Sequence, residues 1–230
     1  MNALLILPAL LLSCNSVAMF APRSTPAACC AERFPEAQSP LSVKGGAEGT
    51  NLGDVLGNLS RSTGLVVTAS SAVSGMLAAT GAGLMADAVI PAEEAYSFTE
   101  SLLAANGFYI SSIHGGQTPT IQIVDVRSTR DFQFLAVAPA ELDSFSAHPS
   151  LLVTVNIEMK TADTRQFANS MRQVLTNPAS ERIVAFGSSG ALQLSGPTTL
   201  VKSMIALAQA ADGAAEARAA KAAGSAAEDR

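Results

Sequence analysis

Few residues in this sequence stand at spacings that catalysis requires. The two histidines, His114 and His148, have no serine, cysteine or carboxylate at a spacing that would indicate a catalytic group. A histidine in a linker, where His148 is expected to lie, is most often solvated. The adjacent acids Glu93 and Glu94 are typical of a first helical turn, where negative charge favours the helix dipole. The sequence therefore predicts no catalytic residue, no cofactor, no metal site and no enzyme.

Two glycine motifs suggest phosphate binding at first sight, but their contexts do not support it. Residues 187–190 read Gly-Ser-Ser-Gly, which matches the GxxG loop with which KH domains clamp nucleic acid. In KH domains this loop joins two helices, whereas here it falls between two expected strands and no lysine or arginine follows it closely. The segment therefore predicts a hairpin turn. Gly81 and Gly83 lack the third glycine of a dinucleotide-binding loop.

Composition and charge narrow the class of protein further. Hydrophobic residues make up 48% of the chain and charged residues 14%, which is enough to bury a core and is not typical of a disordered chain. The formal net charge is -5 and the pI is about 5.0. This disfavours a nucleic-acid partner, because binding to phosphates needs clustered lysine and arginine. Beyond the start of the chain, no apolar run is long enough to predict a membrane span.

The first residues predict export from the cytoplasm. Residues 1–13 form a short apolar run that ends at Cys14, so residues 1–18 are interpreted as an export or lipoprotein signal. Two processing routes stay open. Residues 11–14, Leu-Leu-Ser-Cys, resemble the lipobox of bacterial lipoproteins, in which the cysteine is acylated, so Cys14 is the candidate lipid-attachment residue. Alternatively, residues 16–18, Ser-Val-Ala, form an ordinary cleavage site after Ala18.

Residues 19–40 contain four prolines with small residues between them and are interpreted as a tether. Cys29 and Cys30 are adjacent within it. Adjacent cysteines rarely bridge each other because the geometry is strained. They are interpreted as plain tether thiols, and pairing with another chain in an oxidising compartment stays open.

A compact unit is expected at residues 151–212. Residues 151–159 alternate apolar and polar side chains, as in a half-buried strand whose Thr154, Asn156 and Glu158 point away from the core. Asp163 is expected to cap a helix that stops at Asn177 before a proline. A hairpin follows at residues 183–194, and residues 196–197 are expected to open a last helix that ends at 212–213. The expected inward residues of the two helices are Phe167, Met171, Val174 and Leu175, and Val201, Met204, Ile205 and Ala208.

Another unit is expected at residues 41–126. It comprises a strand at 41–43, a helix capped by Asn51 and ended by Gly64, and a strand at 65–68. A turn is expected at 73–75, and then a helix from residue 90 to the cap at 106–107. Two strands at 108–113 and 120–124 complete it. The expected inward residues are Leu52, Val55, Leu56 and Leu59 in the first helix, and Ala95, Phe98 and Leu102 in the second.

Two segments lie outside these units. Residues 127–150 link the units, and residues 132–137 are a candidate added strand. Residues 213–230 are rich in alanine, which favours helix, but they have no apolar stripe with which to dock. This tail is therefore interpreted as a frayed helix or a disordered end.

The unit at 151–212 resembles the small repeated periplasmic domain of the secretins, the outer-membrane ring proteins of type II and type III secretion and of type IV pili. In that family an apolar strand leads to a polar-Ala-Asp helix start. A hairpin then ends in glycine, and a final amphipathic helix closes on aspartate. The matching segments here are residues 162–163, 192–196 and 205–212.

The unit at 41–126 resembles the N-terminal domain of secretins, which is also the signalling domain ahead of TonB-dependent receptors. The matching segments are residues 52–56, 63–65, 73–75, 94–95 and 102–107. The sequence departs from the pattern between Met76 and Ile90, where glycine and alanine replace the usual short strand. The edge of that sheet is therefore left open.

The resemblance implies an α+β fold of two small domains, each with helices packed on one face of a small mixed sheet. The second domain is expected to have the KH-like order strand-helix-strand-strand-helix. The implied function is that of a periplasmic scaffold or interaction component of a type II-like secretion or pilus system, with protein partners and no nucleic acid. A lipid on Cys14 would add attachment to the outer membrane. The partner-binding residues are not predicted.

A second function is also open for these domains. The alternative is a ligand- or signal-binding periplasmic module like the receptor signalling domain. The long β-rich pore domain of secretins has no counterpart in this sequence. The chain by itself is therefore not expected to form an outer-membrane channel.

Overall fold

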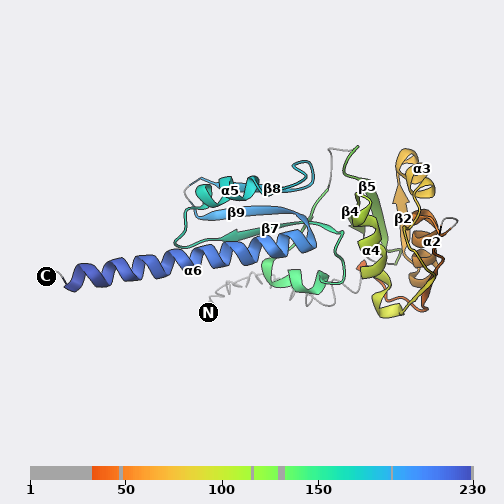
Figure 1. Cartoon of the computed structure of the whole chain (residues 1–230), viewed down its shortest axis with the longest axis horizontal. Helices are drawn as coiled ribbons and strands as arrows, with labels where there is room; N and C mark the ends of the chain where they lie inside the picture. The colour runs from red at the N-terminus through yellow and green to blue at the C-terminus, as the bar shows by residue number, and fades with distance from the viewer. Residues whose placement is uncertain (1–32, 47–48, 115–116, 129–132, 188, 229–230) are drawn as a thin grey trace, which may run out of the picture.

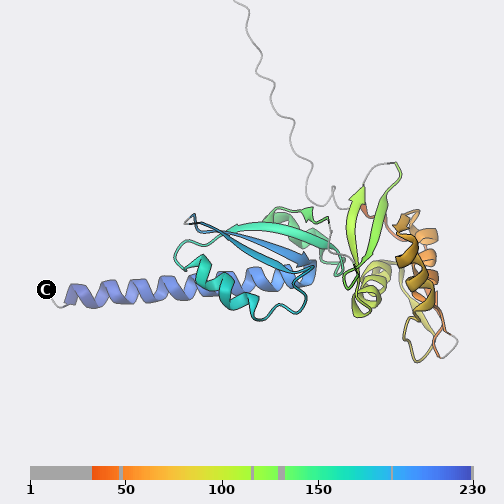
Figure 2. The same ribbon diagram turned by 90° about the horizontal axis from the view of Figure 1, so that it is seen from above.

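The computed structural model of the chain describes residues 33–46, 49–114, 117–128, 133–187 and 189–228. Two small α+β domains lie end to end, and a long C-terminal helix projects from the second domain away from the first (Figures 1 and 2). This confirms the predicted α+β class. Within the described ranges, no helix combines the length and apolarity needed to cross a bilayer.

The first domain contains a two-stranded ribbon, a three-stranded sheet and three α-helices. Its elements are β1 (Leu41–Val43), α2 (Leu52–Thr63), β2 (Val66–Ala69), α3 (Ser71–Ala79), β3 (Ala88–Ile90), η1 (Ala92–Glu94), α4 (Ala95–Ala105), β4 (Phe108–His114) and β5 (Thr120–Asp125). Strand β1 pairs with β3 in antiparallel fashion. The other sheet has the order β2-β5-β4, in which β2 runs parallel to β5 and β4 runs antiparallel to it.

Helix α2 forms as its sequence predicts. The Asn51 side chain accepts the backbone N–H of Asp54, which satisfies one of the free donors at the start of the helix. Gly64 ends the helix with φ 73°, a left-handed conformation that favours glycine. The apolar stripe between these caps is buried, as expected: Leu52, Val55, Leu56 and Leu59.

Two expectations for the first domain are wrong. Residues 73–75 are not a turn but part of α3, because Ser70 caps that helix by accepting the N–H of Val73, and Val73 and Leu77 bury one face. The inward face of α4 is also rotated from the predicted one. Phe98 and Leu102 are only half-buried, and the fully buried residues are Ala95, Tyr96, Thr99, Glu100 and Leu103. Periodicity missed this face because Glu100 is polar but has buried partners.

The second domain has the predicted order strand-helix-strand-strand-helix with additions at its start. Its elements are β6 (Leu135–Ala136), η2 (Pro139–Phe145), β7 (Leu152–Glu158), α5 (Thr164–Arg172), β8 (Arg182–Phe186), β9 (Ala191–Pro197) and α6 (Thr198–Glu228). The sheet order is β6-β7-β9-β8. The expected linker strand is realised only as the two residues of β6, which run parallel to β7.

Both helices of the second domain cover the same face of its sheet. Helix α5 packs on β8 and β9, and α6 packs on β7 and β9. The core between helices and sheet is apolar, as the sequence predicts. It includes Ala168, Val201, Met204 and Ala208 of the helices and Val155, Ile183, Leu192 and Leu194 of the strands.

The ends of α5 and α6 differ from the predictions. Helix α5 ends at Arg172, well before Asn177, because the Glu181 carboxylate accepts the backbone N–H groups of Thr176 and Asn177 and holds that segment as a loop. Val174, predicted to face inward, is 67% exposed.

Pro197 does not open α6. It is the last residue of β9, where it pairs with Leu152, and α6 begins at Thr198. The helix also does not end at residues 212–213 but continues to Glu228. The alanine-rich sequence after Gly213 sustains the helix. The Asp212 side chain accepts a hydrogen bond from the loop at Thr161 and does not end the helix.

Candidate partner-binding surface

The structure places His148 in the interior and not in solvent. Its Nδ1 lies 2.7 Å from Oε1 of Glu100 on α4. The other carboxylate oxygen, Oε2, accepts the backbone N–H and the hydroxyl of Ser150, each at 3.1 Å. All three residues are buried. The prediction of a solvated linker histidine is therefore wrong, because the connector folds back over α4 and gives a buried carboxylate its hydrogen-bond donors.

This grouping has the composition of a hydrolase triad but not its connections. In a triad the serine hydroxyl bonds to the histidine, which takes its proton. Here the Ser150 hydroxyl donates to Glu100 instead, and Ser150 is fully buried. The arrangement therefore serves to join structural elements and does not activate a nucleophile.

The same residues connect the two domains. Ile110 on β4 donates its N–H to the Ser150 carbonyl at 3.0 Å. The next carbonyl, that of Leu151, accepts the N–H and the hydroxyl of Thr198 at the start of α6. Ser150 is thus bonded to the first domain and Leu151 to the second. We call the contact among Glu100, His148, Ser150 and Leu151 the joint.

The face of the second sheet opposite its helices is exposed in the half that lies away from the joint, and this half is the best-defined surface for a partner. Strand register places Val184 opposite Gln193, and Gln193 opposite Asn156. The next row is Phe186, Ala191 and Glu158. Phe186 is 46% and Val184 39% exposed, while Asn156 and Glu158 are also exposed. We call these two rows the open sheet face.

The polarity of the open sheet face changes from one edge to the other. Its β8 side is apolar and its β7 side is polar, so it combines an apolar contact with a wet rim, as protein interfaces commonly do. The predicted outward direction of Asn156 and Glu158 agrees with their exposure. The apolar contribution of Val184 and Phe186 was not predicted, because both were assigned only to a hairpin.

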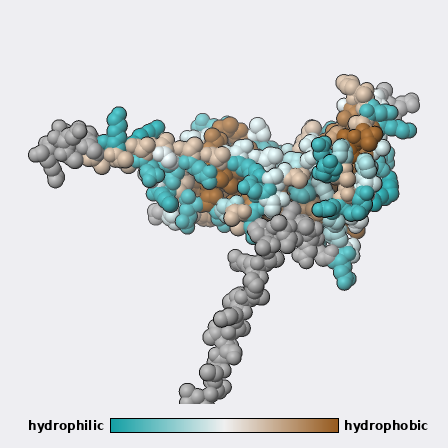
Figure 3. Space-filling view, turned by 90° about the horizontal axis from the view of Figure 1, so that it is seen from below, coloured by the Kyte–Doolittle hydropathy of each residue, from teal (hydrophilic) through white to brown (hydrophobic). Residues whose placement is uncertain are grey.

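Other exposed apolar side chains lie elsewhere. Figure 3 shows apolar areas beside the long helix and at the outer end of the first domain. Leu207 on α6 is 51% exposed. At the ribbon of the first domain, Met85 is 96% and Val89 71% exposed. Leu207 lies on a single helix, Met85 on a loop and Val89 on a three-residue strand, whereas the open sheet face presents two rows from three adjacent strands.

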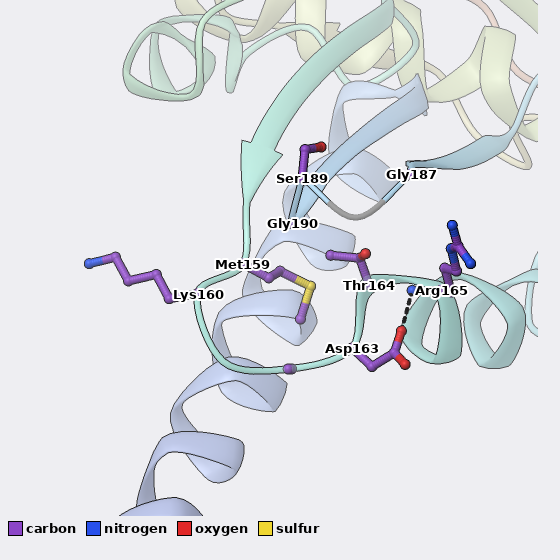
Figure 4. A pocket seen from close by; sticks show the side chains of 9 residues that line it. Met159, Lys160, Asp163, Thr164, Arg165, Gly187, Ser189 and Gly190 are labelled. Carbon is purple, nitrogen blue, oxygen red and sulfur yellow. Dashed lines mark hydrogen bonds between the residues drawn. The ribbon is translucent and has the colours of Figure 1, made fainter.

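The glycines of the GxxG segment lie beside a polar hollow of about 480 Å³. Figure 4 shows Gly187, Ser189 and Gly190 facing the start of α5, with Lys160 directed away from them. The carboxylate of Asp163 already accepts the N–H groups of Arg165 and Gln166 at this helix start. These backbone N–H groups, which could otherwise bind a phosphate at the helix N-terminus, therefore already have an acceptor within the protein. The GxxG segment joins β8 to β9 as the predicted hairpin.

The remaining residues singled out in the sequence divide into two groups. Cys14, the candidate lipid-attachment residue, and the tether thiols Cys29 and Cys30 lie outside the described residues. Glu93 and Glu94 lie in η1 before α4. Among the described residues, no group of three or more histidine, cysteine, aspartate or glutamate side chains is placed to hold a metal ion.

Comparison with known proteins identifies the fold. No protein-family model and no curated protein matches the chain. Among solved structures, the chain is similar to one from the Klebsiella pneumoniae type II secretion system outer membrane complex of PulD, PulS and the PulC HR domain. The TM-score is 0.52 and the identity 15%, over 74% of this chain and 26% of that chain.

Two further matches have low TM-scores and add no argument. They are the GspC-GspD complex of enterotoxigenic Escherichia coli, at 12% identity and TM-score 0.27 over 76% of this chain and 99% of that chain, and the N-terminal domain of the secretin XcpQ from Pseudomonas aeruginosa. The second has 13% identity and TM-score 0.25 over 76% of this chain and 64% of that chain. The chain shares its fold with part of the Klebsiella chain and covers 26% of that chain's length.

Proposed function

We propose that this protein is a periplasmic scaffold of a type II-like secretion system and acts by docking its domains onto protein partners. The observation that carries the proposal is the fold likeness, which extends over 74% of the chain and therefore over both domains. The solved complex contains PulD, PulS and the PulC HR domain, and components of this kind are the proposed partners here. The same scaffold function in a pilus system is the other form of this proposal.

The open sheet face supports docking by a modest contact. Standard stable interfaces bury about 800 Å² on each partner, and two exposed apolar residues with a polar rim offer much less. A contact of this size is weak alone, but attachment in a common assembly raises the local concentration to about millimolar and makes it sufficient. We therefore expect the protein to be mainly monomeric in dilute solution and to assemble beside other secretion components.

The location of the protein is part of the proposal. Export through the signal at residues 1–18 would place both domains in the periplasm, and acylation of Cys14 would attach them to the outer membrane. Intact-mass analysis of the mature protein from its native host tests this point. Acylation at Cys14 supports the anchor, whereas an unmodified N-terminus at Met19 supports a soluble periplasmic form.

Site-specific photo-crosslinking tests the docking surface. A photoreactive residue at Val184, on the open sheet face, should capture a secretion-system component in native membranes. The matched control is Val174, an exposed valine that follows α5 on the opposite, helix-covered side. Equal capture at both positions would contradict docking through this face. Recovery of RNA, or of no secretion component at any position, would contradict the scaffold function.

One observation favours the alternative of a ligand-binding module. A recess of about 580 Å³ lies between α2, β2 and α3. Its walls carry small residues, including Gly53, Gly57, Ser74 and Ala78, and its floor includes Leu56 and Leu77. A small ligand that co-purifies with the protein and is lost on Ala78→Trp would support this function.

A further inference from the structure

A short N-terminal segment, residues 33–38, is built into the joint between the domains. Phe34 is 4% exposed, although it lies within residues 19–40, which the sequence predicts to be a tether. Its ring stacks on His148 with centroids 3.6 Å apart and an interplanar angle of 21°. On its other side it meets Tyr96 edge to face at 5.5 Å. The Phe34 side chain therefore lies between α4 and the connector that carries the second domain.

Among the described residues, two polar contacts fix this segment on the first domain. The Tyr96 hydroxyl donates to the Pro35 carbonyl at 2.7 Å. The N–H of Gln38 donates to the Ser62 carbonyl at 2.9 Å, at the end of α2. Residues 33–38 thus lie along the first domain, while Phe34 reaches across to the histidine of the connector.

Phe34 shields the side chains of the joint from water. His148 lies between Glu100, which holds its Nδ1, and Phe34, which covers its ring. Removal of Phe34 would expose the ring and the buried carboxylate to water, and water competes for the hydrogen bonds that Ser150 and His148 donate to Glu100. The covalent link between the domains would remain, but the side-chain contacts that set their relative orientation would weaken.

We propose that residues 33–38 act as an N-terminal pin: with Phe34 inserted the two domains hold one orientation, and with Phe34 withdrawn the second domain is released from the first. Residues 19–32, which precede this segment in the chain, belong to the predicted tether. Tension on the tether would therefore act directly on the joint, whereas a tether attached at a remote surface would leave the joint untouched. The pin does not depend on the proposed secretion role.

The test measures the distance between the domains in the full chain. Spin labels are attached to cysteines introduced at Ala72 on α3 and Gln209 on α6, which are exposed helical positions, with Cys14, Cys29 and Cys30 changed to serine. Pulsed electron resonance then gives the distance distribution. The pin predicts a single narrow distance in this background and a broader or multiple distribution in Phe34→Ala. The matched control is Phe186→Ala, which removes a phenylalanine far from the joint and should leave the distribution narrow.

Two further measurements keep the outcome decisive if Phe34→Ala folds poorly. Tyr96→Phe removes only the hydroxyl that holds Pro35 and should increase amide exchange of Ile110, whose N–H bonds to Ser150, while α2 amides stay protected. Phe34→Leu keeps an apolar side chain without the stacked ring and should give an intermediate width. An unchanged distribution in Phe34→Ala, or equal broadening in Phe186→Ala, would overturn the pin.

Discussion

The carboxylate of Asp212 lies 2.7 Å from the backbone nitrogen of Thr161, which joins the middle of α6 to the loop between β7 and α5. The same carboxylate accepts the N–H groups of Lys160 at 2.9 Å and Ala162 at 2.8 Å. These hydrogen bonds lower the pKa of Asp212 below its ordinary value. The bond from Lys160 has the largest effect, followed by those from Ala162 and Thr161. One side chain therefore satisfies three consecutive loop donors.

Asp212→Asn should lower the melting temperature at pH 7 in a way that depends on pH. Because the folded pKa of Asp212 is depressed, its contribution to stability is fully present above the unfolded pKa of about 4 and is lost as pH falls through the folded pKa. The difference from wild type should therefore shrink in acid. Thermal unfolding from pH 7 to pH 3 checks this.

The matched control for Asp212 is Asp143→Asn. Asp143 pairs with Lys202 at 2.8 Å but its side chain is 95% exposed, and exposed ion pairs contribute little. Asp143→Asn should therefore change the melting temperature only slightly at every pH. A difference between Asp212→Asn and wild type that stays constant down to pH 3 would contradict the role of the ionised carboxylate.

Glu100→Ala should destabilise the protein strongly. It leaves the donors of Ser150 and His148 buried without their acceptor, and removal of one partner of such a buried pair costs about 3–5 kcal/mol. Urea unfolding measures this cost. Glu93→Ala, at an exposed position in η1, should change the free energy of unfolding by less than about 0.5 kcal/mol. Similar midpoints for the two variants would mean that Glu100 does not hold the joint.

The elements that the sequence predicted well are those with a local cause. The strand at β7 and the stripe Val201, Met204, Ile205 and Ala208 follow from periodicity, and the starts of α2 and α5 follow from caps at Asn51 and Asp163. The missed boundaries have distant causes. Helix α5 ends early through Glu181, and Pro197 stays in β9 through its pairing with Leu152.

The candidate sites divide in the same way. The sequence predicted that Asn156 and Glu158 face outward, because alternation in a strand is local. It did not predict the joint, because Glu100 and His148 are distant in the chain and neither neighbours a motif. Ser150 stands two positions after His148, but Ser146 stands two positions before it, so this spacing did not single out the joint. Phe34 could not be found either, since it stands within residues 19–40, which have the composition of a tether.

Positions 167 and 168 of α5 test the helix phase in the structure. Phe167 packs against the core but is half-buried, so Phe167→Ala should cost less than the 3–5 kcal/mol typical of a fully buried phenylalanine, about 2 kcal/mol. Ala168 is 1% exposed, and Ala168→Leu should cost about 1–3 kcal/mol by overpacking. Chemical denaturation measures both.

Arg165→Ala is the control on the exposed side of α5. It should change the free energy of unfolding by less than about 0.5 kcal/mol. If Ala168→Leu proves neutral while Arg165→Ala destabilises, the helix faces the sheet with a different side.

The two glycines of the GxxG segment should differ in their tolerance of alanine. Both have positive φ, 54° at Gly187 and 71° at Gly190, so each alanine variant costs about 1–2 kcal/mol of left-handed strain. A Cβ at Gly190 would also lie 2.6 Å from the Met159 carbonyl oxygen, whereas one at Gly187 meets nothing within 4 Å. Gly190→Ala should therefore have the lower melting temperature, and equal losses would contradict this close approach.

The two halves of α6 should differ in stability. The first half buries Val201, Met204 and Ala208 against the sheet, whereas residues 216–223 are exposed throughout. A helix of fewer than about 12–15 residues without packing is marginal in water. Amide hydrogens of residues 201–208 should therefore exchange slowly and those beyond Glu216 rapidly. A chain truncated after Glu216 should keep the wild-type melting temperature and lose helical signal in circular dichroism. A fall in melting temperature on truncation would mean that the projecting half packs on the protein.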